Sequence, residues 1–198
     1  MKVAIIAVQG DVEEHVFITK KAMDKLGISG DAIATIDKDL VEKSDAIILP
    51  GGESTTISKF IHQKSIATEI KKAAIEGKPI MGTCAGSILL AKHGDEQIEK
   101  TETKLLELMD IWIKRNVFGR QKQSFQTRLN IKHVGEFEAV FIRAPAIIKA
   151  ENNVDVLAKI DDYIVAAKQD NILAITFHPE LTNDTRLHEF FLKMASYQ

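Results

Sequence analysis

The sequence has one cysteine, no long apolar run and no marked excess of either charge. Cys84 is the only cysteine in 198 residues, which excludes an intrachain disulfide and a zinc site built from several cysteines. Lys and Arg number 26 and Asp and Glu number 28, so the net charge is −2. Neither a basic excess nor a polybasic run is present, and we therefore expect no binding to nucleic acid or to a membrane surface.

The apolar runs are also too short to cross a membrane. The longest run near the N-terminus, Val3 to Val8, is far below the roughly 20 residues of a membrane helix. It lacks the length and the cleavage site of a secretory signal, so we expect a buried strand and a cytoplasmic protein. Hydrophobic residues make up 45% of the chain, enough for an ordinary core in a single domain covering 1–198.

The first half of the chain alternates short apolar runs with segments of helical periodicity. Helical patterns cover 12–26, which Gly27 ends, and 57–76, where one or two helices fit. The apolar runs predict strands at 2–8, 31–36, 46–49 and 80–83. This alternation favours an α/β fold with a doubly wound parallel sheet.

The second half has a different pattern. Strand-like runs follow one another with little helix between them, at 111–114, 126–131, 139–142, 154–159, 163–167 and 173–176. We expect antiparallel pairing there and an amphipathic helix at the C-terminus. The polar segment 93–104 is predicted to be a surface loop. Together the halves predict a three-layer α/β sandwich around a mixed, mainly parallel sheet.

The first candidate for chemistry is Cys84, in the segment 82–86 (GTCAG). A strand is predicted to end and a helix to begin here, so the cysteine would occupy a sharp turn that its flanking glycines permit. The positive end of the helix dipole favours a thiolate at this position. A buried structural cysteine is the alternative for a lone residue of this type, and the local pattern by itself leaves the two about even.

A second candidate is His178, which a predicted strand precedes and Pro179 follows. Side chains at i and i+2 of an extended chain point the same way, so Glu180 can orient the imidazole while its other nitrogen faces a thiol. Most His-x-Glu pairs are only surface polar residues. This pair gains weight because the chain also offers Cys84.

A third candidate is the turn at 50–55 (PGGEST), directly after a predicted strand. Consecutive glycines free two backbone N–H groups to point into a cleft, as in an oxyanion hole. A plain turn is the alternative. A phosphate-binding loop is excluded because no Gly-Lys-Ser/Thr follows the glycines.

Six segments, AVQGD, LPGGEST, GTCAG, NVFGRQ, FIRAP and FHPEL, together resemble the class I glutamine amidotransferases, whose fold is flavodoxin-like. More narrowly, the chain resembles the family of glutaminase subunits of pyridoxal 5′-phosphate synthase, over essentially its whole length. The GTCAG and FHPEL segments indicate only the wider class. The LPGGEST, NVFGRQ and FIRAP segments point to the vitamin B6 branch.

The resemblance implies a role for each matching residue. Cys84 would be the nucleophile, His178 the general base and acid, and Glu180 the orienting carboxylate. The implied oxyanion donors are the N–H groups of Gly52 and Ala85. The implied glutamine contacts are Gly51, Gly52, Glu53, Arg120, Ile142 and Arg143. Gln9 and Gly10 match a segment near the synthase interface.

The implied reaction is hydrolysis of L-glutamine to glutamate and ammonia, without a cofactor or a metal. The ammonia would pass to a separate synthase subunit that makes pyridoxal 5′-phosphate. One alternative is a self-sufficient cysteine hydrolase of similar fold that acts on peptides or small amides. Another is a non-catalytic regulatory homologue, although such a protein would normally lack part of the triad.

Some polar residues are assigned no chemistry at this stage. Arg115 could bind an anion, but it is interpreted as a solvated surface arginine. The remaining histidines lack metal-ligand spacing and are interpreted as surface or satisfied structural residues: His15, His62, His93, His133 and His188.

Overall fold

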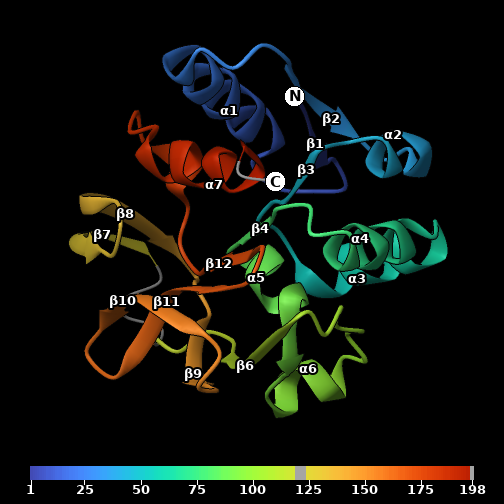
Figure 1. Ribbon diagram of the computed structural model, residues 1–198. Coiled ribbons are helices and arrows are strands. Elements are labelled where there is room, and N and C mark those ends of the chain that lie inside the picture. Colours follow the sequence, from blue (N-terminus) through green and yellow to red (C-terminus); the bar gives the residue numbers. More distant parts are fainter. Residues whose placement is uncertain (119–123, 197–198) are drawn as a thin grey trace.

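The computed structural model describes residues 1–118 and 124–196 (Figure 1). A ten-stranded mixed sheet runs through the molecule, and a separate two-stranded ribbon lies beside it. The sheet strands are β1 (Lys2–Ile6), β2 (Asp31–Thr35), β3 (Ala46–Leu49), β4 (Ile80–Thr83), β5 (Ala91–His93), β6 (Met109–Lys114), β9 (Ala146–Ala150), β10 (Asp155–Ile160), β11 (Tyr163–Gln169) and β12 (Ile172–Ile175). The ribbon consists of β7 (Ser124–Ile131) and β8 (Gly135–Ile142).

Helices cover both faces of the sheet (Figure 1). One layer contains α1 (Val12–Leu26) and α7 (Arg186–Ser196), which contact each other. The other helices are α2 (Lys38–Glu42), α3 (Ser54–Gln63), α4 (Ile66–Ile75), α5 (Ala85–Leu90) and α6 (Glu96–Lys100), with a short 3₁₀ turn, η2, at Pro179–Leu181.

Strand β1 explains why the sheet is buried on both faces. Val3 and Ile5 pack in the core cluster that contains residues of α1 and α7, whereas Ala4 and Ile6 pack in the cluster that contains residues of α3 and α4. Alternate side chains of a strand point to opposite faces, so a continuous apolar run must be covered on both sides. The three-layer α/β architecture is therefore confirmed.

The two halves of the sheet pair differently. Strands β2, β1, β3, β4 and β12 form a parallel ladder, and β11 then pairs antiparallel with β12, β10 and β9. Strand β9 also pairs antiparallel with β6. The predicted change from parallel to antiparallel pairing is confirmed. No strand was predicted at 146–150, although β9 links β11 to β6 in the middle of the sheet.

The predicted surface loop at 93–104 is wrong in part, because α6 lies within it. Asp95 caps this helix by accepting bonds from the N–H groups of Gln97 and Ile98. The side chain of Ile98 is 2% exposed and belongs to the core. Ile98 is a single apolar residue among mainly polar neighbours, so the segment shows no helical pattern of apolar residues.

The register between β4 and β12 positions the candidate site. Thr83 pairs with Ile175, and the Cys84 N–H donates to the Ile175 carbonyl at 2.8 Å. Both strands run in the same direction, so the residues that follow them emerge at the same edge of the sheet. Cys84 and His178 are brought together in this way. Within the described residues, no helix has the length and apolar character needed to span a membrane.

Candidate active site

Cys84 occupies the turn between β4 and α5 with φ 46° and ψ −108°, a conformation that side-chain-bearing residues rarely adopt. The neighbouring glycines are needed by close packing. A Cβ on Gly86 would collide with the Leu49 carbonyl, and one on Gly82 would lie 2.6 Å from the Gly86 backbone. Cys84 as a whole is 8% exposed, and its Sγ lies 3.9 Å from the Ile142 carbonyl oxygen. The turn therefore holds a largely buried cysteine at the start of a helix.

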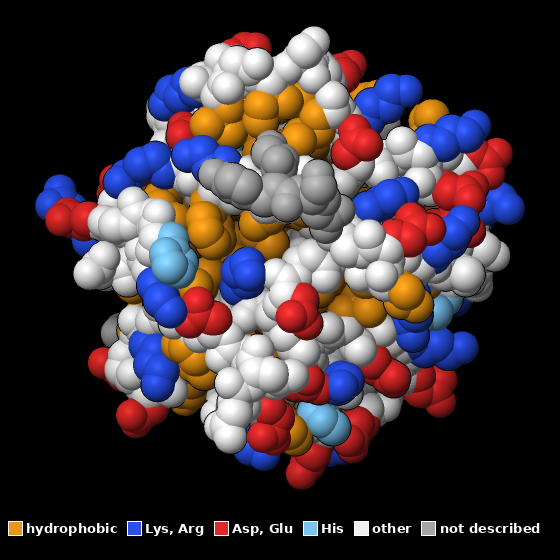
Figure 2. Space-filling model, in the orientation of Figure 1, with side chains coloured by type: hydrophobic (Ala, Val, Ile, Leu, Met, Phe, Trp, Pro, Cys, Tyr) orange, Lys and Arg blue, Asp and Glu red, His pale blue; other side chains and the backbone are white. Residues whose placement is uncertain are grey.

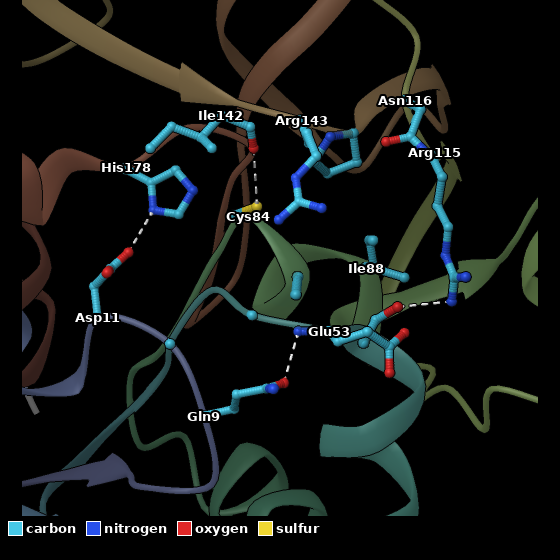
Figure 3. Close-up of a pocket in the computed structure, with 15 residues that line it drawn as sticks. Gln9, Asp11, Glu53, Cys84, Ile88, Arg115, Asn116, Ile142, Arg143 and His178 are labelled. Carbon is cyan, nitrogen blue, oxygen red and sulfur yellow. Dashed lines mark hydrogen bonds and ion pairs between the residues drawn. The ribbon is translucent and has the colours of Figure 1, made fainter. Parts of the chain in front are cut away.

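His178 and Glu180 lie at η2, beyond the end of β12, and both are 4% exposed. The His178 Nδ1 lies 2.6 Å from Glu180 Oε1, a distance typical of a strong, charge-assisted hydrogen bond. The backbone N–H of His178 donates to the Val140 carbonyl at 2.8 Å, and this bond holds the segment against β8. The other ring nitrogen faces the Cys84 side (Figure 3).

A second carboxylate, which was not predicted from the sequence, reaches the same imidazole. Asp11 Oδ2 lies 3.2 Å from His178 Nδ1 (Figure 3). Asp11 occupies the N-cap position of α1, yet its side chain makes no capping hydrogen bond. A cap residue that does not cap its helix is visible only in the structure, so no sequence signal could have found this contact.

The charges around His178 favour its protonated form. Burial by itself lowers the pKa of His178, but hydrogen bonds and charge from Cys84 and Glu180 outweigh burial and raise this pKa to about 10 from an ordinary 6.5. Burial raises the pKa of Glu180, and the bond to His178 opposes that rise. The raised pKa keeps the His178 imidazole protonated near neutral pH, so it can donate a proton.

Asp11, His178 and Glu180 also offer one ligand atom each within 4.8 Å of one another, which a metal ion could in principle use. Metal binding would require a bare lone pair on the His178 nitrogen that faces the carboxylates. That nitrogen instead makes the 2.6 Å contact with Glu180. The geometry therefore favours a proton between these groups over a metal.

The glycine turn at 51–52 crosses directly over the Cys–His pair. A Cβ on Gly51 would lie 2.8 Å from His178 Cε1 and 3.4 Å from Cys84 Cβ, so only glycine allows this approach. Gly52 has φ 125°, a value that suits glycine. The N–H of Ala85, at the first position of α5, belongs to the free donors of a helix N-terminus. The turn and the helix end together flank the Cys84 sulfur.

Gln9 and Gly10 contact this glycine turn. The Glu53 N–H donates to Gln9 Oε1 at 2.9 Å. Gly10 has no Cβ, and one placed there would collide with the Gly51 carbonyl. The segment after β1 therefore supports the turn that covers Cys84.

The remaining candidate residues surround an open cavity of about 490 Å³. Glu53 lines it and also caps α3, accepting from the N–H groups of Thr55 and Thr56. Burial raises the pKa of Glu53, but these hydrogen bonds outweigh it and lower the pKa overall. Arg143 lines the opposite side (Figure 3) and is exposed, with its backbone at φ 43°. Ile142 also lines the cavity, whereas Arg120 lies outside the described residues.

Arg115 is part of this cavity, and its interpretation as a solvated surface residue is wrong. Its guanidinium donates to Ser54 Oγ at 2.7 Å and to Thr103 Oγ1 at 2.9 Å. Its Nε is buried and makes no hydrogen bond among the described residues. A half-buried arginine beside a cavity is suited to bind an anionic group. This environment could not be predicted from the sequence, because Ser54 and Thr103 are far from Arg115 along the chain.

The sequence and the fold also resemble those of known proteins. The model of the SNO glutamine amidotransferase family matches residues 5–197. The chain belongs to the SNO glutamine amidotransferase family. Its resemblance to glutamine amidotransferases is thereby confirmed.

Individual relatives cover nearly the whole chain. A protein named pyridoxal 5′-phosphate synthase subunit PdxT from Archaeoglobus fulgidus is 62% identical over 98% of both chains. The protein of the same name from Methanococcoides burtonii is 52% identical over 97% of this chain and 98% of its own. A crystal structure described as that of a glutamine amidotransferase is 42% identical, with a TM-score of 0.87 over 98% of both chains. The chain therefore resembles these proteins in both sequence and fold.

Proposed function

We propose that the chain hydrolyses L-glutamine to glutamate and ammonia with Cys84, His178 and Glu180, and that the ammonia serves a pyridoxal 5′-phosphate synthase. One observation supports these residue roles above all: Cys84 and His178 both lie close to Gly51, at one end of the 490 Å³ cavity. The names of the relatives support the choice of synthase.

In the first half of the reaction, the Cys84 thiolate attacks the carbon of the side-chain amide. The oxygen of the tetrahedral intermediate becomes negative, and the N–H groups of Gly52 and Ala85 are the proposed donors to it. The imidazolium of His178 gives its proton to the departing nitrogen. Ammonia leaves, a γ-glutamyl thioester remains on Cys84, and His178 is neutral.

In the second half, neutral His178 takes a proton from water, which attacks the thioester. Glutamate leaves, and the thiolate and the imidazolium are restored with release of the remaining proton. Glu180 keeps the Nδ1 proton in place through both halves and stabilises the imidazolium, as the third group does in comparable triads.

The cavity also offers groups for the charged end of free glutamine. Arg115 and Arg143 are cations for the α-carboxylate, and Glu53 is an anion for the α-ammonium. Arg115 is the stronger candidate of the two arginines, because it is half-buried and its guanidinium is held by Ser54 and Thr103, whereas Arg143 is exposed. A site for peptides would not need both charges at this end, so this lining favours free glutamine over the self-sufficient hydrolase.

Gln9 and Gly10 are proposed to receive the synthase subunit. They contact Glu53 and Gly51, so a partner that presses on them can move the Gly51–Gly52 peptide. A glycine peptide rotates at little cost, and one oxyanion donor is worth about 10²–10³ in rate. Docking would therefore switch the glutaminase on.

The same proposal treats the chain as a single functional domain in the cytoplasm. Cys84 and His178 come from opposite halves of the chain, and the β4–β12 pairing joins them. A catalytic thiol must also stay reduced, as it does in the cytoplasm.

A glutaminase assay of the chain, alone and with saturating synthase subunit, tests the proposal. Wild-type protein should release ammonia from glutamine, faster with the partner. Cys84→Ala should lose on the order of 10⁶ in kcat, as nucleophile removal does in comparable triads. Glutamine hydrolysis by Cys84→Ala at the wild-type rate would overturn the mechanism. Equal rates with and without the partner would remove the switch and favour the self-sufficient hydrolase.

A further inference from the structure

Two fully buried histidines lie behind Glu180, outside the cavity. His15 belongs to α1 and His188 to α7, and both are 0% exposed, so neither is a surface residue. His15 Nε2 lies 3.0 Å from Thr83 Oγ1 and 3.3 Å from Glu180 Oε2. On the other side of the ring, His15 Nδ1 lies 3.3 Å from His188 Nε2. The four residues form a continuous polar cluster beneath the catalytic groups.

Two atoms of this cluster are not satisfied. Among the described residues, neither Glu180 Oε2 nor His188 Nδ1 makes a hydrogen bond of full geometry. Glu180 Oε2 nevertheless has His15 Nε2 at 3.3 Å. A buried carboxylate oxygen without a donor is costly. A small movement of the His15 ring toward Glu180 would supply that donor.

The protons of the cluster can be placed by elimination. Burial, followed by the charges of His188 and His178, lowers the pKa of His15 well below its ordinary value, and burial lowers that of His188 to about 3. Each ring is therefore neutral and carries one N–H. His188 Nδ1 faces no acceptor, so its proton belongs on Nε2, where it can be donated to His15 Nδ1. His15 must then carry its own proton on Nε2, facing Thr83 and Glu180.

We propose that His15 is a positioning residue that acts through Glu180, and that His188 fixes the tautomer in which His15 donates. The N–H groups of the two rings then point in sequence from α7 through α1 toward the Glu180 carboxylate. Thr83, which precedes Cys84, shares the same donor. His15 thereby ties the nucleophile turn and the carboxylate to one helix.

Loss of the His15 donor should shift the pKa of Glu180 in one direction, upward. The groups that face Glu180 are His178, Asp11 and His15, and burial together with Asp11 favours protonation of its carboxyl group. A donor on Oε2 opposes this by favouring the ionised form. Loss of the His15 donor would raise the pH at which Glu180 takes up a proton. His178 would then lose its stabilising carboxylate at a higher pH.

The test, which rests on the proposed glutaminase function, compares His15→Leu with His15→Gln in the complex with the synthase subunit. Leucine removes both nitrogens, whereas the glutamine amide can place a donor near the position of Nε2. His15→Leu should lower kcat by at least about tenfold, the scale of outer-shell partners at other sites. Its acid limb of kcat/KM should move to higher pH, with KM unchanged because His15 does not line the cavity. His15→Gln should recover most of both effects.

His62→Leu is the matched control, because His62 is a half-buried helical histidine whose Nδ1 lies 2.8 Å from the Ser58 carbonyl of its own helix, away from Glu180. It should leave the pH profile unchanged. Nitrogen-15 NMR of the wild-type protein supplies a readout independent of activity and should find His15 protonated on Nε2 alone. An Nδ1-protonated His15, or an unshifted acid limb in a folded His15→Leu variant, would overturn the proposal. Inactive wild-type complex would instead overturn the glutaminase function, and the NMR result would still decide the tautomer.

Discussion

The inner and outer ends of the cavity are built in opposite ways. At the inner end, Cys84, His178 and Glu180 are buried and make short contacts with one another and with neighbouring strands. At the outer end, Arg143 and Asn116 are exposed. Figure 2 shows charged groups of both signs interspersed over the face it presents, without a single-sign patch. The inner end fixes the geometry and protonation of the reacting groups, whereas the outer end only has to recognise a charged, flexible substrate.

This contrast predicts that the largest losses come from the inner end. Glu180→Gln should lower kcat by on the order of 10⁴, the cost of removing the orienting carboxylate in a comparable triad. Glutamine binding should change little, because Glu180 lies behind His178 and does not line the cavity. Steady-state kinetics measure both quantities. Glu136→Gln, an exposed substitution on β8, is the control, and equal activity of the two variants would reassign Glu180 to a structural role.

The protonation of the inner end can be tested by titration. The pKa of His178 is raised to about 10 partly by Cys84, so Cys84→Ser should move it down toward the ordinary value. Because the folded-state pKa is raised, the associated stabilisation is full below about 6.5 and is lost as the pH rises through about 10. NMR titration of the His178 ring measures the shift. An identical titration in wild type and Cys84→Ser would contradict the thiolate–imidazolium pair.

Gly51→Ala tests the close approach of the glycine turn. The new Cβ would lie 2.8 Å from His178 Cε1, so the turn or the ring must shift. We expect a fall in kcat of about 10²–10³, the cost of one misplaced oxyanion donor. Gly27→Ala is the control, because Gly27 ends α1 with φ 64° and open space around it. That variant should lose some stability and keep its activity.

The outer end should respond more weakly, and mainly through KM. Arg115→Met should raise KM for glutamine about tenfold to a hundredfold, since hydrogen bonds to charged groups contribute about 1.5–3 kcal/mol. Arg143→Met should have a smaller effect, because its exposed charge is screened by water. Lys114→Met, an exposed neighbour on β6, should change nothing. A larger effect at Arg143 than at Arg115 would exchange the two assignments.

Prediction from the sequence succeeded best where local pattern and burial agree. The apolar runs at 2–8 and 46–49 and the turn at Cys84 all follow from backbone chemistry within a few residues. The segment 57–76, predicted to hold one or two helices, contains two, because Ser65 interrupts the helical backbone with φ 60°. The strand at 146–150 was missed because only three apolar residues precede Lys149 in it, too short a run to stand out.

The site was predicted only where a motif lies within one short segment. His178 and Glu180 are two residues apart, so extended geometry alone places them together. Arg115 and Asp11 gave no such signal, because their partners are remote in sequence: Arg115 donates to Ser54, and Asp11 contacts His178. Contacts of this kind depend on how strands and helices pack and not on spacing.

By itself, the sequence determined the alternating α/β pattern, the sharp turn at Cys84 and the identity of the reactive side chains, because these depend on neighbours along the chain. Only the tertiary structure decided that β12 lies beside β4, that Arg115 faces the cavity and that His15 and His188 lie behind Glu180. Desolvation and the approach of charges from distant segments set the protonation states of these groups. Both effects arise only when folding buries these groups and brings the distant segments together.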